Sequence, residues 1–296
     1  MPEWVVTAEE SGWKLLSFLA HRFEEKYSAR HLKKLIERNA CEINGRTERF
    51  ASAVLGKGDR IRLHLVDSVV SSPQGVESSR ILFEDDALLI YNKPSGVNCD
   101  EKGILQFWRS TLPSLQLVHR LDRDTTGVLL LTKQSVLFNR LVEQFKLLQV
   151  EKSYLTIVDG LMNQSEGRIE NYLGKKRLFA GQTIWGEVAK TEGLYACTEW
   201  KRLKKGDGAT LVACYPRTGR THQIRVHMAE MGHPILGDFQ YGKSFQCVYR
   251  PSRTLLHAEK IRFNHPVTGV ELTISAPIPD DFKTAQRKLF KSLEIS

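Results

Sequence analysis

The sequence predicts an α+β protein, in which a small N-terminal α+β domain precedes a mixed, mostly antiparallel sheet with flanking helices. The apolar run 128–131 has the length and composition of a strand buried on both faces. Residues 152–160 alternate between apolar and polar types, and residues 165–210 continue as short apolar segments separated by charged turns, which is typical of an antiparallel meander. Apolar residues also recur at helical spacing in several separate stretches, so helices are expected beside the sheet.

The composition is that of an ordinary globular protein. Of its 296 residues, 41% are hydrophobic and 26% are charged, which suits one large domain with a small partner domain. The formal net charge is +9, and such an excess of basic residues favours a polyanionic partner. The N-terminus lacks the pattern of a signal peptide, and no apolar stretch reaches the roughly 18 residues of a membrane span. We therefore expect a cytoplasmic monomer without membrane association.

Cysteines and histidines indicate neither a disulfide framework nor a metal site. The five cysteines are scattered and form no C-x-x-C pair, which is typical of a protein from a reducing compartment. His222, His227 and His233 lie close together in the sequence but lack the H-E-x-x-H spacing of a helical zinc site. No metal is therefore expected.

Residues 1–66 are expected to form the small domain. Apolar residues at helical spacing predict a first helix, and Ser28 can cap a second one. Asn44-Gly45 is a strong hairpin signal, and the alternation over 60–65 predicts a further strand. One face of the second helix is basic, and its side chains are either simply solvated or a surface for a polyanion. They are Arg30, Lys33, Lys34 and Arg38.

The larger domain is expected to span residues 80–296. It follows a serine-rich stretch, residues 67–79, which contains proline and glycine but no periodic pattern and is predicted to be a linker. Two strands around an acidic turn are predicted for residues 81–93. Ser135 can cap a helix that follows the buried strand.

Charged residues crowd in front of the buried strand, in the sequence H-R-L-D-R-D-T-T-G at 119–127. A solvated run of charges is the usual interpretation of such a cluster. The mouth of a buried strand is also a common place to hold a reactive group rigidly. Gly127 can turn the backbone into the strand at a point where a side chain would clash.

Two further segments combine chemical groups with regular structure. Residues 152–160 read K-S-Y-L-T-I-V-D-G, which places a tyrosine on a predicted strand. Residues 217–227 read R-T-G-R-T-H-Q-I-R-V-H, and here Thr221 can cap a helix that ends at Gly232. A tyrosine on a strand most often packs in the core, so these residues alone assign no function.

Together these segments resemble the signatures of the RluA-type pseudouridine synthases, which isomerise uridine in RNA. H-R-L-D at 119–122 resembles the first signature, and the strand with the tyrosine resembles the second, with Thr156 in place of an alanine. Residues 217–227 resemble the third, and residues 84–96 resemble the family motif E-D-x-x-L-x-x-x-N-K-P-x-G. The resemblance covers roughly residues 81–280 and implies a central catalytic cleft.

The small domain resembles the RNA-binding domain named after ribosomal protein S-four. Two short helices are followed by I-N-G at 43–45 and by G-D-x-I at 58–61, although Asn39-Ala40 replaces the usual glycine. This resemblance makes RNA the expected partner of the basic helix face. The combination with an H-R-L-D domain resembles the family branch that acts on large-subunit ribosomal RNA, and transfer RNA is the alternative substrate.

The resemblance also implies which residues carry the reaction. Asp122 is the expected catalytic carboxylate, Arg225 the cation that keeps it ionised, and Tyr154 a residue that packs on the base and can accept a proton. A carboxylate in a dry pocket needs such a cation within about 4–6 Å. His119 and Arg120 are the expected substrate-binding residues, with Arg120 in the space that the flipped nucleotide leaves. The reaction neither oxidises nor transfers a group, so no cofactor is required.

Two other functions are compatible with parts of the sequence. A catalytically silent RNA-binding protein could keep the same fold, but it would be expected to lack Asp122, Tyr154 or Arg225, and all three are present. A metal-dependent phosphoesterase could use His119, Asp122 and Asp124, and it would require a divalent metal. The sequence also leaves open whether Asp122 attacks the base or acts at the sugar.

Overall fold

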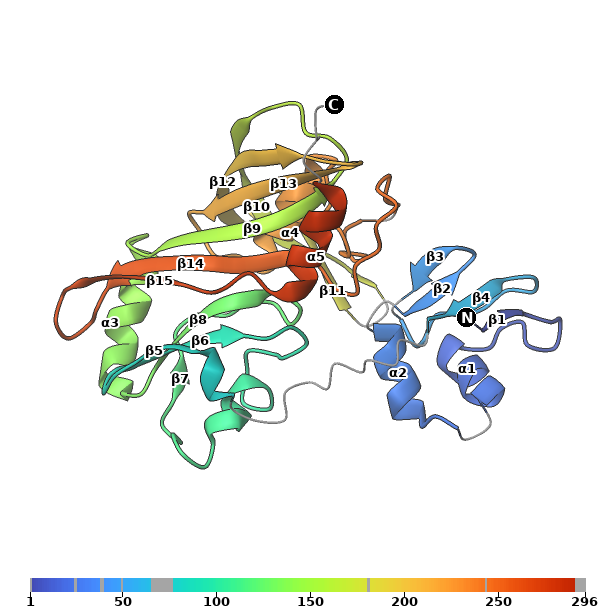
Figure 1. Cartoon of the computed structure of the whole chain (residues 1–296), viewed down its shortest axis with the longest axis horizontal. Helices are drawn as coiled ribbons and strands as arrows, with labels where there is room; N and C mark the ends of the chain where they lie inside the picture. Colours follow the sequence, from blue (N-terminus) through green and yellow to red (C-terminus); the bar gives the residue numbers. More distant parts are fainter. Residues whose placement is uncertain are drawn as a thin grey trace. The chain divides into compact units, whose positions relative to one another are not determined.

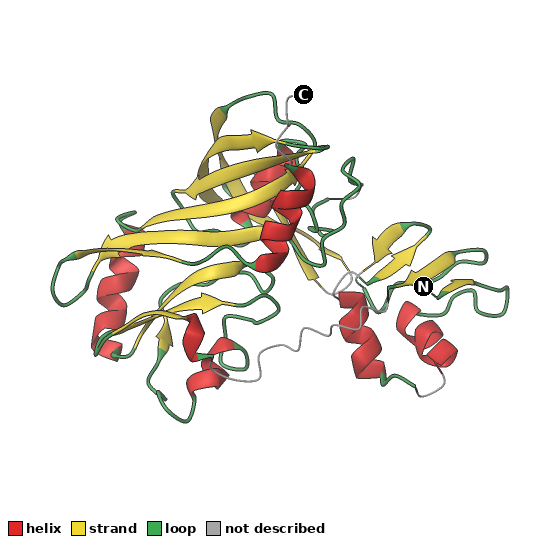
Figure 2. Ribbon diagram, viewed as in Figure 1, coloured by secondary structure: helices red, strands yellow, loops and turns green. Residues whose placement is uncertain are grey.

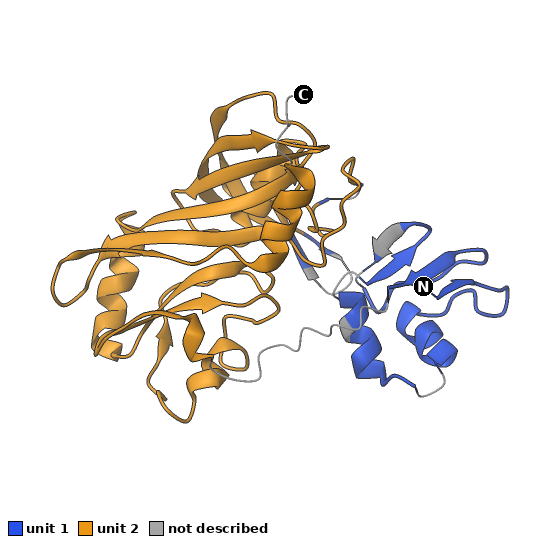
Figure 3. Ribbon diagram, in the orientation of Figure 1, with its two compact units in different colours: residues 1–70, 177–184, 242–244 blue, residues 71–176, 185–241, 245–296 orange. Residues whose placement is uncertain are grey.

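The computed structural model describes residues 2–23, 26–37, 40–48, 50–64, 77–179, 182–242 and 244–290. The chain divides into two compact units, which Figure 3 distinguishes by colour. The first consists of residues 1–70 with the short segments 177–184 and 242–244, and the second contains the remainder. Most of the linker predicted at 67–79 lies outside the described residues, so the boundary there stays a prediction.

In its described part, the N-terminal region has two helices and a four-stranded antiparallel sheet in the order β1-β4-β2-β3 (Figure 1). As predicted, Ser28 caps the second helix, because its Oγ accepts a backbone hydrogen bond of 3.2 Å. Asn44 and Gly45 have φ values of 54° and 74°, which the tight turn of the predicted hairpin requires. The strand predicted at 60–65 is described as far as residue 63, and residue 65 lies outside the described part. The elements are β1 (Glu3–Val5), α1 (Leu15–Phe23), α2 (Ala29–Glu37), β2 (Cys41–Ile43), β3 (Arg46–Glu48) and β4 (Arg60–Leu63).

The larger sheet has 11 strands within the described residues, in the order β11-β10-β12-β13-β9-β14-β8-β6-β5, with β15 beside β14 and β7 beside β8 (Figure 1). Strands β10, β12, β13 and β9 are antiparallel neighbours, whereas β8 and β14 pair in parallel. The antiparallel pairing predicted for 165–210 is present, but a simple meander is not, because β12 pairs with β10 and not with β11. The prediction of a mixed, mostly antiparallel sheet is therefore confirmed. The strands are β5 (Ile81–Glu84), β6 (Leu88–Lys93), β7 (Gln116–Leu117), β8 (Thr126–Thr132), β9 (Glu151–Asp159), β10 (Glu166–Phe179), β11 (Gln182–Glu187), β12 (Leu194–Lys205), β13 (Ala209–Pro216), β14 (Leu256–Asn264) and β15 (Glu271–Ser275).

Strand β8 is buried along its whole length. Val128 and Leu130 join the hydrophobic cluster that contains α3, while the two leucines between and after them join a second cluster. A strand covered on both faces reads as an unbroken apolar run, which is the pattern seen in the sequence. Gly127 has a φ of 111°, and a Cβ there would lie 2.1 Å from the carbonyl oxygen of Ala258 on β14. Glycine therefore permits the close parallel pairing of β8 and β14.

Three helices pack against the larger sheet (Figure 2): α3 (Ser135–Lys146), α4 (Gln223–Glu230) and α5 (Asp280–Leu289). Both predicted N-caps of this region are wrong. Ser135 is already the first helical residue of α3, and Gln134 occupies the cap position without a side-chain hydrogen bond. The cap position of α4 belongs to His222 rather than Thr221. No helix in the described part of the chain is long and apolar enough to cross a membrane.

Candidate active site

The segment in front of β8 carries the aspartate singled out in the sequence. Asp122 begins a tight turn, in which the backbone N–H of Thr125 donates to the carbonyl oxygen of Asp122 over 3.1 Å. Leu121 and Thr125, on either side, are buried. The side chain of Asp122 is 27% exposed. The buried neighbours thus anchor the turn while the carboxylate stays accessible.

Lys93, the last residue of β6, stabilises this turn from the protein interior. The lysine is fully buried, and Nζ donates to the carbonyl oxygens of Pro94, Val97 and Arg123, each at 2.9 Å. The backbone N–H of Gly96 donates to the same Arg123 oxygen over 2.8 Å. Burial lowers the pKa of Lys93 to about 8. The N-K-P-S-G segment therefore holds the residue next to Asp122 through backbone contacts.

Arg225, on α4, is the cation that contacts Asp122. Its side chain is 8% exposed, and Nη1 lies 3.2 Å from Oδ2 of Asp122. Asp238 accepts hydrogen bonds from Nε and Nη2 at 2.6 and 2.9 Å, and Gln240 accepts one from Nη2 at 2.7 Å. Burial opposes the charge of Arg225, but Asp238 and then Asp122 outweigh it and raise the pKa of Arg225 above its usual range. A fixed, permanently charged guanidinium thus presents one N–H to Asp122.

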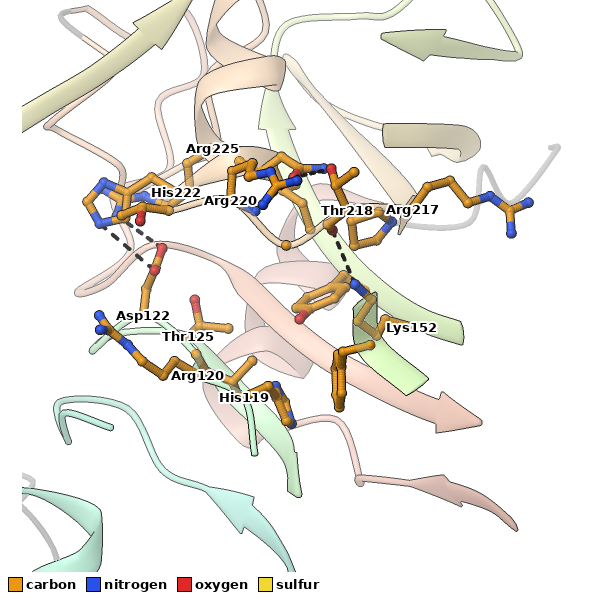
Figure 4. A pocket seen from close by; sticks show the side chains of 18 of the residues that line it. His119, Arg120, Asp122, Thr125, Lys152, Arg217, Thr218, Arg220, His222 and Arg225 are labelled. Atoms are coloured by element: carbon orange, nitrogen blue, oxygen red, sulfur yellow. Dashed lines mark hydrogen bonds and ion pairs between the residues drawn. The ribbon is translucent and has the colours of Figure 1, made fainter. Parts of the chain in front are cut away.

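His222 faces the other oxygen of the same carboxylate. Its Nε2 lies 3.9 Å from Oδ1 of Asp122, and Figure 4 shows His222 and Arg225 on the side towards which the carboxylate points. Its Nδ1 lies 2.7 Å from the hydroxyl oxygen of Tyr241. Burial, followed by the charge of Arg225, lowers the pKa of His222 to about 4, so the ring is neutral at neutral pH. His222 also has a φ of 56°, which is uncommon for a residue other than glycine.

A cavity of about 710 Å³ opens beside Asp122. This volume lies within the roughly 300–1,000 Å³ that ligand pockets occupy. Tyr154, from β9, lines the cavity, and burial raises its pKa, so the phenol keeps its proton at neutral pH. Most of the remaining wall comes from the loop before β8, from α3, from the segment that connects β13 with α4, and from the start of α4.

The β13–α4 segment is held in place by one buried glutamine. The Oε1 of Gln223 accepts hydrogen bonds from the hydroxyl of Thr218 at 2.7 Å and from the backbone N–H of Arg220 at 3.0 Å. Its amide nitrogen donates to the carbonyl oxygen of Cys197 at 2.9 Å. Lys152 donates to the carbonyl oxygen of Thr218 at 3.1 Å, and burial lowers the pKa of Lys152 to about 8. Gln223 and Lys152 thus fix the β13–α4 segment at the wall of the cavity.

The two expected substrate-binding residues in the segment before β8 have different surroundings. Arg120 is exposed and lines the cavity next to Asp122 (Figure 4). His119 also lines the cavity, but its Nε2 accepts a hydrogen bond from the backbone N–H of Leu130 at 3.0 Å. Its ring stacks on Phe145, and burial lowers the pKa of His119 to about 3. His119 is thus a neutral residue that is bonded to β8 through Nε2 and that lines the cavity.

The expected basic surface of the N-terminal region is only partly described. Arg30 and Lys33 are exposed on α2, and Lys33 lies 4.0 Å from Glu37. The side chain of Lys34 and the whole of Arg38 lie outside the described residues.

Metal ligands do not gather in the part of the chain that the structure describes: no three histidine, cysteine or acidic residues are placed to hold one ion. Asp124 is bound to Arg123, with Oδ1 at 3.0 Å from Nε, and His119 is bonded to the backbone of β8. The geometry of His119, Asp122 and Asp124 therefore offers no support for a metal-dependent phosphoesterase.

Comparison with known proteins identifies the chain. Residues 87–230 match the sequence pattern of the RNA pseudouridylate synthases. The ribosomal large subunit pseudouridine synthase C of Escherichia coli strain K12 is 32% identical over 307 residues, which cover 96% of this chain and 95% of that protein. This chain belongs to the RNA pseudouridylate synthase family. The resemblance to the RluA-type signatures is thereby confirmed, and the chain is an isomerase that converts uridine in RNA into pseudouridine.

Further relatives and solved structures of pseudouridine synthases also match this chain. The enzyme of the same name from Buchnera aphidicola subsp. Schizaphis graminum is 40% identical over 218 residues, which are 69% of each chain. Among solved structures, human RNA pseudouridylate synthase domain containing 4 has a TM-score of 0.61 and 25% identity, and it covers 72% of this chain and 94% of its own. Human RNA pseudouridylate synthase domain containing 1 has a TM-score of 0.58 and 27% identity, with 67% of this chain and 82% of its own covered.

Several residues around the site of this synthase were not predicted from the sequence. Lys93, Asp238 and Tyr241 lie in segments that resemble the family, yet nothing in their spacing shows that they meet around residues 122 and 225. The spacing of His222 raised only the question of a metal ligand. No local pattern singled out Asp238, because the same G-D pair at 206–207 leaves Asp207 exposed.

Proposed function

We propose that this synthase uses Asp122 as its catalytic carboxylate on a uridine of large-subunit ribosomal RNA. The observation that carries this proposal is the ion pair of Asp122 with Arg225 at the wall of the cavity. A carboxylate can act on a uridine only when it is ionised and fixed in direction. Arg225 supplies both conditions, because Asp238 and Gln240 hold it from behind.

The other site residues receive roles that follow from their positions. Tyr154 lines the cavity with an aromatic ring, which suits packing against the uracil base. Arg120 is exposed beside Asp122, where it can occupy the space that a flipped nucleotide leaves. His119 also lines the cavity and stays in the proposed substrate-binding set, with its Nε2 bonded to β8. The isomerisation needs no redox group, so the proposal includes no cofactor.

Ribosomal RNA is proposed as the substrate on two grounds. The relatives with 32–40% identity are named as synthases of the ribosomal large subunit. The net charge of +9 and the exposed Arg30 and Lys33 also suit a large polyanion. We propose in addition that residues 1–66 form an RNA-binding domain joined by a linker at 67–79 to the catalytic domain at 80–296, and that the protein is a cytoplasmic monomer.

The test is to map pseudouridines in total RNA from cells with the protein, without it, and with Asp122→Asn. We expect one or a few large-subunit positions to lose pseudouridine without the protein and to stay unmodified with Asp122→Asn, because the amide cannot replace a charged carboxylate. Asp100→Asn, at an exposed aspartate of the same unit, is the matched control and should restore modification. Lost positions in transfer RNA would refute the substrate, and modification by Asp122→Asn within tenfold of the wild type would refute the catalytic residue.

A further inference from the structure

His222 lies between Tyr241, to which it is hydrogen-bonded, and the carboxylate of Asp122. The backbone N–H of Trp185 donates to the hydroxyl oxygen of Tyr241 over 3.3 Å. That hydroxyl lies 2.7 Å from Nδ1 of His222, and Nε2 of the same ring lies 3.9 Å from Oδ1 of Asp122. Three residues far apart in the sequence are thus aligned on one oxygen of the carboxylate.

The direction of these contacts follows from the protonation of the side chains. Burial raises the pKa of Tyr241 and lowers that of His222, so the tyrosine keeps its proton and the imidazole is neutral. A neutral imidazole has a single N–H. If Nδ1 carried it, the lone pair of Nε2 would face the negative Oδ1 of Asp122. The favoured arrangement therefore has Tyr241 donating to Nδ1, with the N–H of Nε2 directed at Asp122.

The backbone of His222 supports a role beyond helix capping. His222 occupies the N-cap position of α4 with φ 56° and ψ 17°, and its side chain makes no capping hydrogen bond. The left-handed conformation is unfavourable for most residues with a side chain. Asparagine adopts it at least as readily as histidine, and it would be a better cap. The strained histidine is therefore used for what its side chain reaches, which is Tyr241 on one side and Asp122 on the other.

We propose that His222 is a positioning residue for Asp122. The Nε2–H of His222 forms a hydrogen bond to Oδ1 of Asp122 when the target uridine enters the cavity. Oδ2 is already held by Arg225 at 3.2 Å, so the second contact would hold both oxygens and leave the carboxylate a single orientation. The observed 3.9 Å is longer than a hydrogen bond, and a small rotation of either side chain closes it. This inference rests on the proposed catalytic role of Asp122.

Two substitutions at one position separate this role from a purely structural one. His222→Gln keeps an amide N–H close to the position of Nε2, whereas the shorter His222→Asn reaches only towards Tyr241. His222→Asn also tolerates the left-handed backbone, so it is expected to fold at least as well as the wild type. A capping or backbone role thus favours asparagine over glutamine, and positioning of Asp122 favours glutamine over asparagine.

The measurement is single-turnover and steady-state kinetics of the full chain on an RNA fragment that contains the mapped uridine. We expect His222→Asn to lower kcat about ten- to hundredfold, as for loss of one hydrogen bond to a charged group, with KM within about threefold of the wild type. His222→Gln should recover kcat to within about fivefold of the wild type. His227→Leu is the control from the same helix, because the ring of His227 bonds to Thr198 and Asn171. This variant should lower Tm, and it should not show the selective fall in kcat that is expected of His222→Asn.

Two outcomes overturn the positioning role: a kcat for His222→Asn within threefold of the wild type, or a kcat for His222→Gln as low as that of His222→Asn. Asp122→Asn is run beside them to separate this inference from the proposed function. If Asp122→Asn is inactive while His222→Asn is fully active, only the inference fails; if Asp122→Asn is also active, the catalytic assignment fails with it. A variant that does not fold is replaced by Tyr241→Phe, which removes the donor to Nδ1 and should lower kcat severalfold with unchanged RNA affinity.

Discussion

Arg225 on α4 and Lys33 on α2 are both helical cations, but their surroundings are opposite. The side chain of Arg225 is 8% exposed and is bonded to Asp122, Asp238 and Gln240. That of Lys33 is 57% exposed and lies 4.0 Å from Glu37. A desolvated cation with fixed partners can orient one carboxylate, whereas an exposed cation attracts phosphates in a way that salt screens. The first is expected to act on turnover and the second on affinity.

The buried cation can be removed directly. Arg225→Met takes away the charge that faces the fully buried Asp238, and it also leaves Asp122 unsupported. We expect the unfolding free energy to fall by about 3–5 kcal/mol and turnover to be lost in the molecules that stay folded. Denaturant unfolding and single-turnover assays measure the two effects. Arg225→Lys is the matched variant: it should regain part of the stability but little activity, because an ammonium cannot replace the forked contacts. Normal turnover of Arg225→Met would exclude Arg225 as the partner of Asp122.

The tyrosine of the cavity tests whether the site needs a hydroxyl or only a ring. Tyr154→Phe keeps the ring, and RNA affinity should be unchanged. We expect kcat to fall about a hundredfold, which is the scale of a lost proton-transfer group. Burial raises the pKa of Tyr154, so its hydroxyl is protonated at neutral pH. The hydroxyl can therefore accept a proton only if it donates its own proton to another group at the same time. Tyr91→Phe, on β6 of the same sheet, is the control, and it should keep normal kcat. A loss below threefold for Tyr154→Phe would leave packing as its only role.

The buried Lys93 is expected to make the stability of the protein depend on pH. The pKa of Lys93 is lowered by burial to about 8, against about 10.4 in an unfolded chain, so between these values the unfolded state binds more protons. Stability of the wild type should therefore rise with pH in this window, by about 2–3 kcal/mol from pH 7 to pH 10 relative to Lys93→Met. Lys133→Met, which removes a lysine with 17% side-chain exposure that pairs with Glu84, is run beside it as the control for loss of a lysine. Parallel stability curves for the wild type and Lys93→Met would show that Lys93 is not charged and desolvated as described.

The exposed cations are expected to give the smallest effect. A double variant, Arg30→Gln with Lys33→Gln, should weaken binding of ribosomal RNA roughly three- to tenfold without changing kcat at saturation. The slope of log affinity against log salt should become shallower by about 0.7–0.9 for each phosphate that the variant no longer neutralises. Lys283→Gln with Lys288→Gln, at exposed positions of α5, is the charge-matched control. If both double variants weaken binding equally, the α2 face makes no specific contact with RNA.

Local patterns were enough for much of the fold. The strand at 128–131, the hairpin at Asn44-Gly45 and the cap at Ser28 were all predicted, because each depends on residues adjacent in the sequence. The caps of α3 and α4 were predicted wrongly, because a helix start does not depend on adjacent residues alone. At the start of α4, for example, the side-chain amide of Gln223 donates to the distant carbonyl oxygen of Cys197.

The site divides in a similar way. The resemblance identified Asp122, Tyr154 and Arg225 from three separated segments, and the structure places all three at one cavity. The same resemblance selected His119 for substrate, and the tertiary structure adds that its Nε2 is bonded to Leu130 of β8 at the cavity wall. A motif names the residue types that stand together, but the neighbouring strand decides what each side chain faces.

Sequence alone determined the family, the reaction, the mixed sheet and the candidate carboxylate, since each is carried by short motifs or by the period of apolar residues. Only the tertiary structure decided that Lys93 holds the turn of Asp122, that Asp238 bonds Arg225, and that His222 faces Oδ1 of Asp122. These contacts join residues that are mostly tens of positions apart, and they depend on burial, which removes water and makes each unpaired charge costly. A linear pattern contains neither distance nor burial, so the electrostatics of the site emerge only when the chain is folded.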